Sequence, residues 1–289
     1  MHQNILFYDK QRWREAISQP VNTLQVFITN KCNMNCKSCF YAHKLGKEEL
    51  SFEEYKKTLS FYLHKIDKVI LLGGEPTLYR DINKVVNLNN KFNLRTTVYT
   101  NGSNIKILEN VDLSKTTIRI GVYGAKLSEK PLANVPKTSL PVTIVYMLRK
   151  NNVKELMKTA KMVEKRFNCQ GFYISSIRDI AVTQSYWEDT KETLLLKDYF
   201  KVIQNFIKNY KGNIPKIHIA RRGVIKTENK YVPINKCRFG NIFPDKKKII
   251  CPLDISKKSY TKRLIFNQRK CNKNKECVLQ KIVLEKITS

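Results

Sequence analysis

Two patterns of apolar and polar positions alternate along the first 210 residues of the chain. Short apolar runs rich in β-branched and aromatic residues predict buried strands, and stretches with apolar positions at helical spacing predict helices between them. The predicted strands are 24–29, 68–72, 95–100, 117–122, 141–148 and 171–176, and the predicted helices are 51–65, 82–91, 103–110, 153–167 and 194–210. Asn152 followed by Glu155 is typical of a capping box at the start of the fourth helix.

Strands that alternate with helices predict an α/β fold with a parallel sheet and covering helices. The six strand–helix units are fewer than the eight of a complete barrel, so we expect a partial (β/α)6 barrel. After about residue 212 the chain changes to short strands, turns, basic runs and cysteines. We therefore predict an N-terminal extension over 1–22, a core over 23–230 and a small cysteine-rich C-terminal domain of hairpin and helix over 231–289.

The charge of the chain is strongly basic and unevenly distributed. The formal net charge of the 289 residues is +30, of which +16 lies in the last 79 residues. Such a surface is either a solvated, lysine-rich face or a binding surface for an acidic partner such as a peptide or nucleotide. No apolar run reaches the roughly 18 residues of a membrane span. Residues 1–13 lack the apolar segment of a signal peptide, so we expect a cytoplasmic protein without membrane contact.

Eight cysteines suggest metal binding rather than disulfides, because thiols stay reduced in the cytoplasm. Seven of them fall into two groups, which are Cys32, Cys36 and Cys39, and then Cys237, Cys251, Cys271 and Cys277. Cys169 stands alone between a predicted helix and a predicted strand. We interpret it as a buried or inert thiol rather than as a catalytic hydrogen donor.

The first cysteine group has the spacing C-x3-C-x2-C and directly follows the first predicted strand. In a parallel α/β fold this loop lies at the C-terminal edge of the sheet, where ligands bind. Three thiolates can hold three irons of a four-iron cluster and leave the fourth iron open. The alternative is a zinc site closed by a fourth ligand such as His43.

A second motif, Gly73, Gly74, Glu75 and Pro76, follows the second predicted strand and is expected beside the cysteine loop. The glycines would let a ligand approach the backbone closely. Glu75 offers a carboxylate to an ammonium group, and Pro76 restricts the turn. Alone, this sequence could be only a tight strand-to-helix turn. The two motifs on successive strands, in this order, are far more specific.

Together these motifs resemble those of the radical SAM superfamily, over roughly residues 22–210. The resemblance implies a [4Fe-4S] cluster held by Cys32, Cys36 and Cys39, whose open iron chelates the methionine part of S-adenosylmethionine (SAM). It also implies that the motif around Glu75 holds the SAM amino group. Asn101 corresponds to a polar position near the SAM ribose, although an Asn before a Gly is also typical of an ordinary turn.

The resemblance also implies the chemistry. A donor such as flavodoxin or ferredoxin reduces the cluster, SAM is cleaved to a 5′-deoxyadenosyl radical, and the radical abstracts hydrogen from a substrate. Arg149 lies in a segment similar to that of peptide-modifying members, and its role stays open. Where many members have an aromatic residue near the adenine, this chain has Ser38. Phe40 or Tyr41 could replace that aromatic residue.

The second cysteine group is predicted to begin as a β-hairpin with Cys237 and Cys251 at its base. Cys271 and Cys277 follow in a basic loop. Four thiolates complete either a four-iron cluster or a zinc site. The segment resembles the twitch domain, the shortened SPASM extension of radical SAM enzymes. This resemblance implies one auxiliary [4Fe-4S] cluster, which would accept an electron from a substrate radical.

Three functions fit these observations. The first is a radical SAM enzyme that oxidatively modifies a peptide or protein, which the twitch-like tail and the basic surface favour. Against it, the roughly 24 residues before the first strand are too few for a separate peptide-recognition domain. The second is the same chemistry on a carbohydrate, a nucleotide or RNA. The third is a basic nucleic-acid-binding protein with structural zinc sites, whose affinity would fall steeply with salt.

Overall fold

The computed structural model describes residues 5–7, 23–36, 39, 41–126, 128, 130–176, 194, 196–219, 239–242 and 248–249. Its strands are β1 (Ile5–Phe7), β2 (Thr23–Thr29), β3 (Lys68–Gly73), β4 (Arg95–Thr100), β5 (Thr116–Val122), β6 (Thr138–Leu148), β7 (Phe167–Ser176), β8 (Ile217–Ile219), β9 (Phe239–Ile242) and β10 (Lys248–Ile249). Its α-helices are α2 (Phe52–Tyr62), α3 (Ile82–Lys91), α4 (Leu156–Arg166) and α5 (Leu196–Asn209). Short 3-10 helices are η1 (Ala42–Lys44), η2 (Leu63–Lys65), η3 (Pro76–Leu78), η4 (Ile105–Leu108), η5 (Leu132–Asn134) and η6 (Lys150–Glu155).

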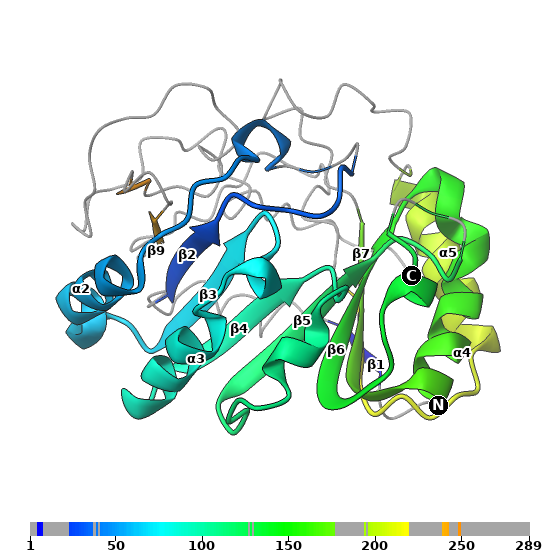
Figure 1. Cartoon of the computed structure of the whole chain (residues 1–289). Helices are drawn as coiled ribbons and strands as arrows, with labels where there is room; N and C mark the ends of the chain where they lie inside the picture. Colours follow the sequence, from blue (N-terminus) through cyan, green and yellow to red (C-terminus); the bar gives the residue numbers. More distant parts are fainter. Residues whose placement is uncertain are drawn as a thin grey trace, which may run out of the picture.

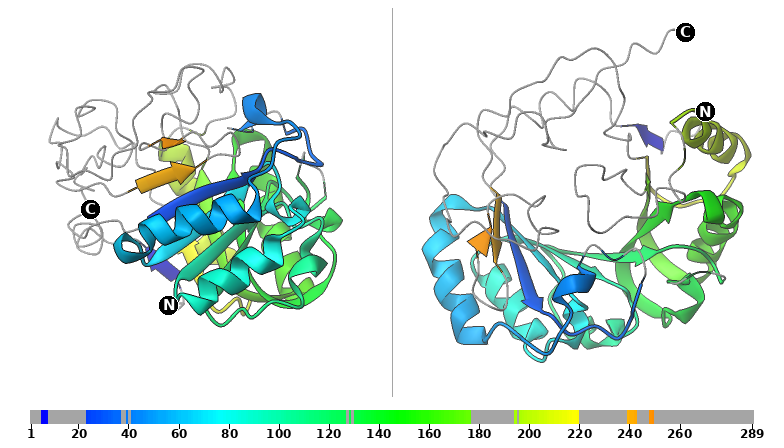
Figure 2. Two further views of the ribbon diagram at one scale, coloured as in Figure 1. Left: turned by 60° about the vertical axis from the view of Figure 1, so that its left-hand side comes forward. Right: turned by 90° about the horizontal axis from the view of Figure 1, so that it is seen from above.

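The described strands form one sheet in the order β1-β8-β7-β6-β5-β4-β3-β2-β9-β10. Neighbouring strands from β1 to β9 are parallel, and β9 and β10 pair in the antiparallel direction. The sheet curves into an arch and the helices cover its outer face (Figures 1 and 2). This confirms the predicted α/β partial barrel. Among the described residues, no helix is long and apolar enough to span a membrane.

The sheet is wider than the six predicted strands, because strands from both ends of the chain join it. On one side β1 pairs with β8, and on the other β9 pairs with β2. The hairpin predicted in the tail is present as β9 and β10, whereas Cys237, Cys251, Cys271 and Cys277 lie outside the described residues. The predicted division of the chain at 22 and 230 stays a prediction, although strands from all three parts share this sheet.

Alternate residues of each strand face the helices and form the main core, which follows from the period of two in a strand. In β5, Ile118 and Ile120 are fully buried, whereas Arg119 between them points to the concave inner face and is half-buried. Buried apolar side chains of the helices, such as Val85 and Val86 of α3, complete this core. The inner face therefore carries the side chains that a ligand inside the arch would meet.

Two local predictions are wrong. The helix predicted at 103–110 is only the 3-10 helix η4, in a chain segment that turns back after β4. The helix predicted at 153–167 is present as η6 followed by α4, whereas the capping box predicted from Asn152 and Glu155 is not formed. Instead, the Asn152 amide donates to the carbonyl oxygens of Tyr123 and Met147, and Glu155 accepts bonds from the loop after β5. These side chains are used by long-range contacts, which local sequence does not reveal.

Candidate active site

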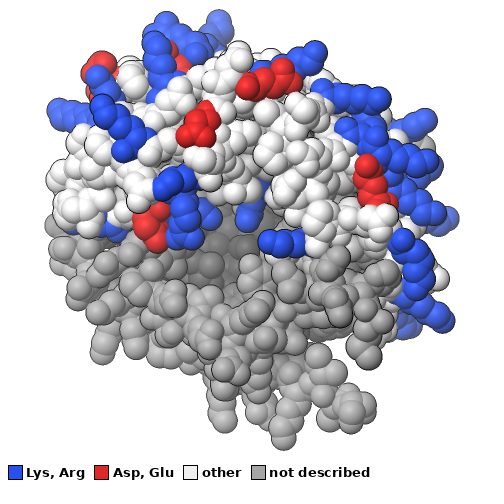
Figure 3. All heavy atoms as spheres, turned by 90° about the horizontal axis from the view of Figure 1, so that it is seen from below, with Lys and Arg blue, Asp and Glu red and all other residues white. Residues whose placement is uncertain are grey.

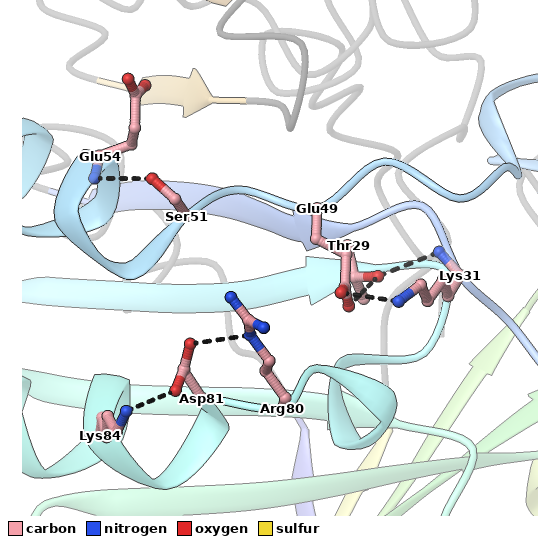
Figure 4. A network of polar contacts seen from close by, with 8 residues as sticks. All are labelled: Thr29, Lys31, Glu49, Ser51, Glu54, Arg80, Asp81 and Lys84. Carbon is pink, nitrogen blue, oxygen red and sulfur yellow. Dashed lines mark hydrogen bonds and ion pairs between the residues drawn. The ribbon is translucent and has the colours of Figure 1, made fainter.

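The loop that carries the three cysteines is held by hydrogen bonds and an ion pair where it leaves β2. The hydroxyl of Thr29 donates to Glu49 at 3.1 Å and accepts from the backbone N–H of Lys31 at 3.0 Å. Lys31 and Glu49 also form an ion pair of 2.7 Å. Figure 4 shows these contacts beside the cap of α2, where the Ser51 hydroxyl accepts from the N–H of Glu54. The carboxylate of Glu49 thus joins the start of the loop to the segment that returns from it.

The other end of the loop is held by an aromatic stack on the inner face of β2. Tyr41 is 1% exposed, lies 4.9 Å from Phe27 between ring centroids, and donates from its hydroxyl to Asn30. Cys39, Leu45 and Leu72 belong to the same small apolar cluster. A ring used in this way packs the loop against the sheet, so the suggestion that Tyr41 stacks on adenine is not supported. Ser38 and Phe40 lie outside the described residues.

Cys32, Cys36 and Cys39 are half-buried on this loop. Burial raises the pKa of Cys39, and the charges of Cys36 and Cys32 raise it further, which shows that the three thiols lie in one electrostatic neighbourhood. Burial also raises the pKa of Cys32. No three Cys, His, Asp or Glu side chains in the described part of the chain are gathered closely enough for a single metal ion. Three thiolates on one loop can each bind a different iron of a four-iron cluster.

Lys130, which the sequence did not single out, supplies a positive charge to this neighbourhood. It opposes the raised pKa values of both Cys32 and Cys39. Its Nζ lies over Gly121, where an added Cβ would approach to 3.1 Å. The carbonyl of Lys130 accepts from the N–H of Tyr123 at 2.9 Å, which closes the loop after β5. A cation here can balance the negative charge of thiolates and of a bound carboxylate.

The turn after β3 packs directly against the backbone of the cysteine loop. The N–H of Gly74 donates to the carbonyl of Thr29, and the N–H of Glu75 donates to that of Lys31. Gly73 has a φ of 147°, and a Cβ on it would overlap the carbonyl of Thr29. A Cβ on Gly74 would likewise overlap the carbonyl of Lys31. Both glycines are therefore required for the close approach of the two motifs.

Glu75 is 1% exposed, and its carboxylate accepts four hydrogen bonds from the protein. One oxygen accepts from the N–H of Thr77 at 3.0 Å, the hydroxyl of Thr77 at 2.7 Å and the hydroxyl of Thr100 at 2.5 Å. The other accepts from the N–H of Asn101 at 2.6 Å. Three of the four bonds share one oxygen, and the other oxygen keeps capacity for one more donor. Glu75 thus joins the turn after β3 to the end of β4.

Asn101 links this network to the cysteine loop. It is 5% exposed, its amide donates to Asn33 at 2.8 Å, and its carbonyl oxygen accepts from the N–H of Ser103. The amide of Asn33 in turn donates to the Ser103 hydroxyl at 2.8 Å. The bond from Ser103 is that of an Asx turn, as the turn interpretation of Asn101 expects. Three consecutive strand ends, β2, β3 and β4, are therefore held together at one edge.

Arg149 lies at the same edge, after β6, and is 2% exposed. Its guanidinium lies 3.9 Å from the ring centroid of Tyr123, a cation–π contact. Its backbone N–H donates to the Asn152 side chain at 2.7 Å. Arg149 could be singled out from the sequence, but its contacts with Tyr123 and Asn152 could not be predicted. These contacts form only when the chain is folded.

An α/β arch with three cysteines on the loop after its second strand, packed against a glycine turn, defines an enzyme of the iron–sulfur class. The model of the radical SAM superfamily matches residues 26–175, which contain β2 to β7 and both motifs. The chain belongs to the radical SAM superfamily. Membership implies a [4Fe-4S] cluster and SAM as cofactors, and the half-buried thiols and the glycine turn fit both.

Curated relatives match this core but differ in length. The probable GTP 3′,8-cyclase of Thermococcus kodakarensis is 33% identical over 120 residues, which cover 39% of this chain and 36% of that protein. The GTP 3′,8-cyclase of Aquifex aeolicus is 26% identical over 168 residues, covering 53% and 51%. The matches thus span about a third to a half of these relatives.

Solved structures support the fold over more of the chain. SuiB of Streptococcus suis has a TM-score of 0.62 at 16% identity and covers 89% of this chain and 67% of SuiB. The same protein bound to precursor peptide SuiA has a TM-score of 0.61. The structure described as native anSMEcpe with bound AdoMet and Kp18Cys peptide has a TM-score of 0.55 at 17% identity, covering 81% and 75%. At these identities the likeness concerns the fold.

Proposed function

We propose that this protein cleaves SAM reductively and uses the resulting 5′-deoxyadenosyl radical to abstract hydrogen from a substrate held inside the arch. One observation carries the proposal. The cysteine loop and the turn of residues 73–76 are packed backbone to backbone and joined through Glu75, Asn101 and Asn33. A cluster ligand set and a SAM-binding turn need this proximity, because the sulfonium must lie beside the cluster for electron transfer.

The residues of the chain take distinct roles in this proposal. Cys32, Cys36 and Cys39 hold the cluster, which supplies the electron that breaks the carbon–sulfur bond of SAM. Gly73, Gly74 and Pro76 present the turn backbone to the amino end of SAM. Oε2 of Glu75 accepts a single bond from the protein, so this oxygen has capacity to accept a further bond from the amino group of SAM. Asn101 lies next to this turn, where the SAM ribose is proposed to bind.

The decisive experiment is SAM cleavage by the full chain after anaerobic reconstitution with iron and sulfide. With dithionite, or with flavodoxin or ferredoxin as the reductant, we expect slow release of 5′-deoxyadenosine even without substrate. A variant with Cys32, Cys36 and Cys39 all replaced by Ala should release none, whereas Cys169→Ala should behave as the wild type. Production of S-adenosylhomocysteine alone would indicate methyl transfer and contradict the proposal.

The tail cysteines are proposed to hold a second [4Fe-4S] cluster that accepts an electron from the substrate radical. The support is their number, since four thiolates can ligate every iron and leave none open for substrate. Reconstituted wild type should then contain about eight irons, and the triple variant at Cys32, Cys36 and Cys39 about four. Zinc in the tail, or about four irons in the wild type, would exclude the second cluster.

Two substrate classes are supported by different observations. A peptide or protein substrate is favoured by the fold shared with SuiB, whose structure is described with precursor peptide SuiA. A small anionic metabolite is favoured by the inner face of the sheet, where the half-buried Arg119 donates to the Tyr99 hydroxyl at 2.7 Å. This second candidate has the more specific support, because it concerns side chains of this chain rather than likeness of fold.

A further inference from the structure

Three residues form a closed ring of hydrogen bonds where the cysteine loop meets the turn after β4. The Asn101 amide donates to the carbonyl oxygen of the Asn33 side chain, and the Asn33 amide donates to the Ser103 hydroxyl, both at 2.8 Å. The backbone N–H of Ser103 donates to the carbonyl oxygen of the Asn101 side chain, also at 2.8 Å. Each residue therefore donates one bond and accepts one, and we call this arrangement the polar ring.

The polar ring holds the chain on one side of Cys32, and a backbone contact holds it on the other side. Before Cys32, the carbonyl of Lys31 accepts from the N–H of Glu75 at 2.7 Å. After Cys32, the side chain of Asn33 is bound in the polar ring. The N–H of Met34 donates to Sγ of Cys32 at 3.4 Å, so the thiol follows the backbone of this segment. Cys32 is thus held against the turns after β3 and β4.

The polar ring is also joined to the carboxylate that is proposed to meet the amino group of SAM. The backbone N–H of Asn101 donates to Oε2 of Glu75 at 2.6 Å. Asn101 is 5% exposed, whereas Asn33 is an exposed residue. Hydrogen bonds of an exposed side chain contribute little to the stability of a fold, because water competes for both partners. We therefore expect the bonds of Asn33 to fix where the loop lies rather than to hold the fold together.

All three members of the polar ring are neutral, which separates their effect from that of charge. The side of the molecule opposite the cysteine loop differs, since Lys and Arg side chains border a hollow there (Figure 3). Replacing Asn33 by Ala opens the polar ring without removing a charge near the cysteines. Such a variant therefore tests the position of the loop, whereas a variant of Lys130 tests electrostatics.

We propose that Asn33 is a positioning residue for SAM, which acts by holding Cys32 in a fixed place beside Glu75. This role rests on the proposed radical function. In that function SAM attaches at two points, the open iron of the cluster on the cysteine loop and the turn of residues 73–76. Attachment at two points is strongest when both are already correctly placed, because no ordering cost then reduces the affinity. Without the polar ring, the loop is ordered only as SAM binds, and the affinity falls.

The test is calorimetric titration of the reconstituted full chain with SAM, with the iron content measured on the same samples. Asn33→Ala should contain as much iron as the wild type, because every cysteine remains. It should bind SAM about fivefold more weakly, as expected for the loss of one hydrogen-bonded contact. The loss should appear in the KM for SAM during 5′-deoxyadenosine release rather than in the rate at saturating SAM.

The matched control is Asn35→Ala, which should change the affinity for SAM by less than about twofold. Asn35 is exposed on the same loop, and its side chain has no hydrogen bond to another residue that the structure describes. Ser103→Ala should weaken SAM binding as Asn33→Ala does, and the double variant should lose no more, since each change opens the same ring. In the apoprotein, iodoacetamide should modify Cys32 about threefold faster in Asn33→Ala and at the wild-type rate in Asn35→Ala.

Several results would overturn this role. Unchanged affinity in Asn33→Ala, beside a wild type that binds and cleaves SAM, would exclude the positioning role alone. Equal weakening in Asn35→Ala, or additive losses in the double variant, would show that the polar ring is not the cause. Loss of iron from Asn33→Ala would assign the ring to cluster assembly instead. A wild type that binds no SAM would overturn the proposed function together with this role, so the two failures are distinguishable.

Discussion

The carboxylate of Glu75 accepts a hydrogen bond of 2.6 Å from the backbone N–H of Asn101. This bond joins the turn after β3 to the turn after β4, and the Asn101 side chain continues the link to Asn33 in the cysteine loop. A single buried carboxylate therefore determines how three strand ends meet.

Replacing Glu75 by Gln should destabilise the protein even though the shape is conserved. An amide has one acceptor oxygen and one NH2 group, so an N–H would face the N–H of Thr77 or of Asn101. A buried donor without an acceptor costs about 1–3 kcal/mol. Urea unfolding should show this loss for Glu75→Gln. The control Glu53→Gln, at a side chain 77% exposed, should change the free energy of unfolding by less than about 0.5 kcal/mol. Equal stability of the two variants would contradict this account.

Removing the charge of Lys130 should make the cluster harder to reduce. A cation near Cys32 and Cys39 stabilises the more negative, reduced state. Its loss in Lys130→Gln should lower the reduction potential by on the order of tens of millivolts. A redox titration followed by electron paramagnetic resonance measures the shift. Lys126→Gln is the matched control, because Lys126 is in the same loop but exposed. If both variants shift the potential equally, the effect is not specific to Lys130.

Glu155 should stabilise the loop after β5 in a pH-dependent way. Burial alone would raise the pKa of Glu155, but bonds from the N–H groups of Lys126 and Ala125 outweigh it and lower the pKa. A lowered folded-state pKa adds stability above the unfolded pKa, which is lost as the pH falls through the folded value. Glu155→Gln should therefore cost about 1 kcal/mol at neutral pH and progressively less below about pH 4.

Unfolding of the apoprotein across pH measures this difference. Glu109→Gln is a suitable control, since its carboxylate accepts only a long bond of 3.4 Å from Thr138 among the bonds described. A difference between wild type and Glu155→Gln that is constant with pH would show that the charge of Glu155 is unimportant.

Cys169 should be chemically inert in the folded apoprotein. It is 8% exposed, and burial raises its pKa to about 11. At pH 8 only about one thiol in a thousand would be ionised, and the thiolate is the reactive form. Iodoacetamide should modify the half-buried Cys32, Cys36 and Cys39 first, as followed by mass spectrometry of peptides. Modification of Cys169 at the rate of Cys36 would contradict the interpretation of an inert thiol.

The main strands were predictable because each carries its own signal. β2 to β7 are dense in β-branched residues, and each is long enough to bury a row of side chains. The additional strands carry no such signal. β1 and β8 are three residues long, and they become strands by pairing with distant segments, as Ile5 does with Ile217. β9 belongs to the predicted tail hairpin, and only its pairing with β2 was not predictable. The α-helix predicted at 103–110 is not formed for a related reason. This segment makes contacts with distant residues instead, such as the hydrogen bond from the Asn104 side-chain amide to the carbonyl of Thr77.

By itself, the sequence determined the fold class and the two motifs of the site. Cysteine spacing and a glycine-rich turn are local, because each acts through residues a few positions apart. Only the tertiary structure decided what surrounds them. The donors to Glu75 from Thr100 and Asn101, the cation of Lys130 beside the cysteines, and the contact of Arg119 with Tyr99 join segments separated by tens of residues. Charge and hydrogen bonding act through space, so such groups exist only once the parallel strands bring their ends and faces together.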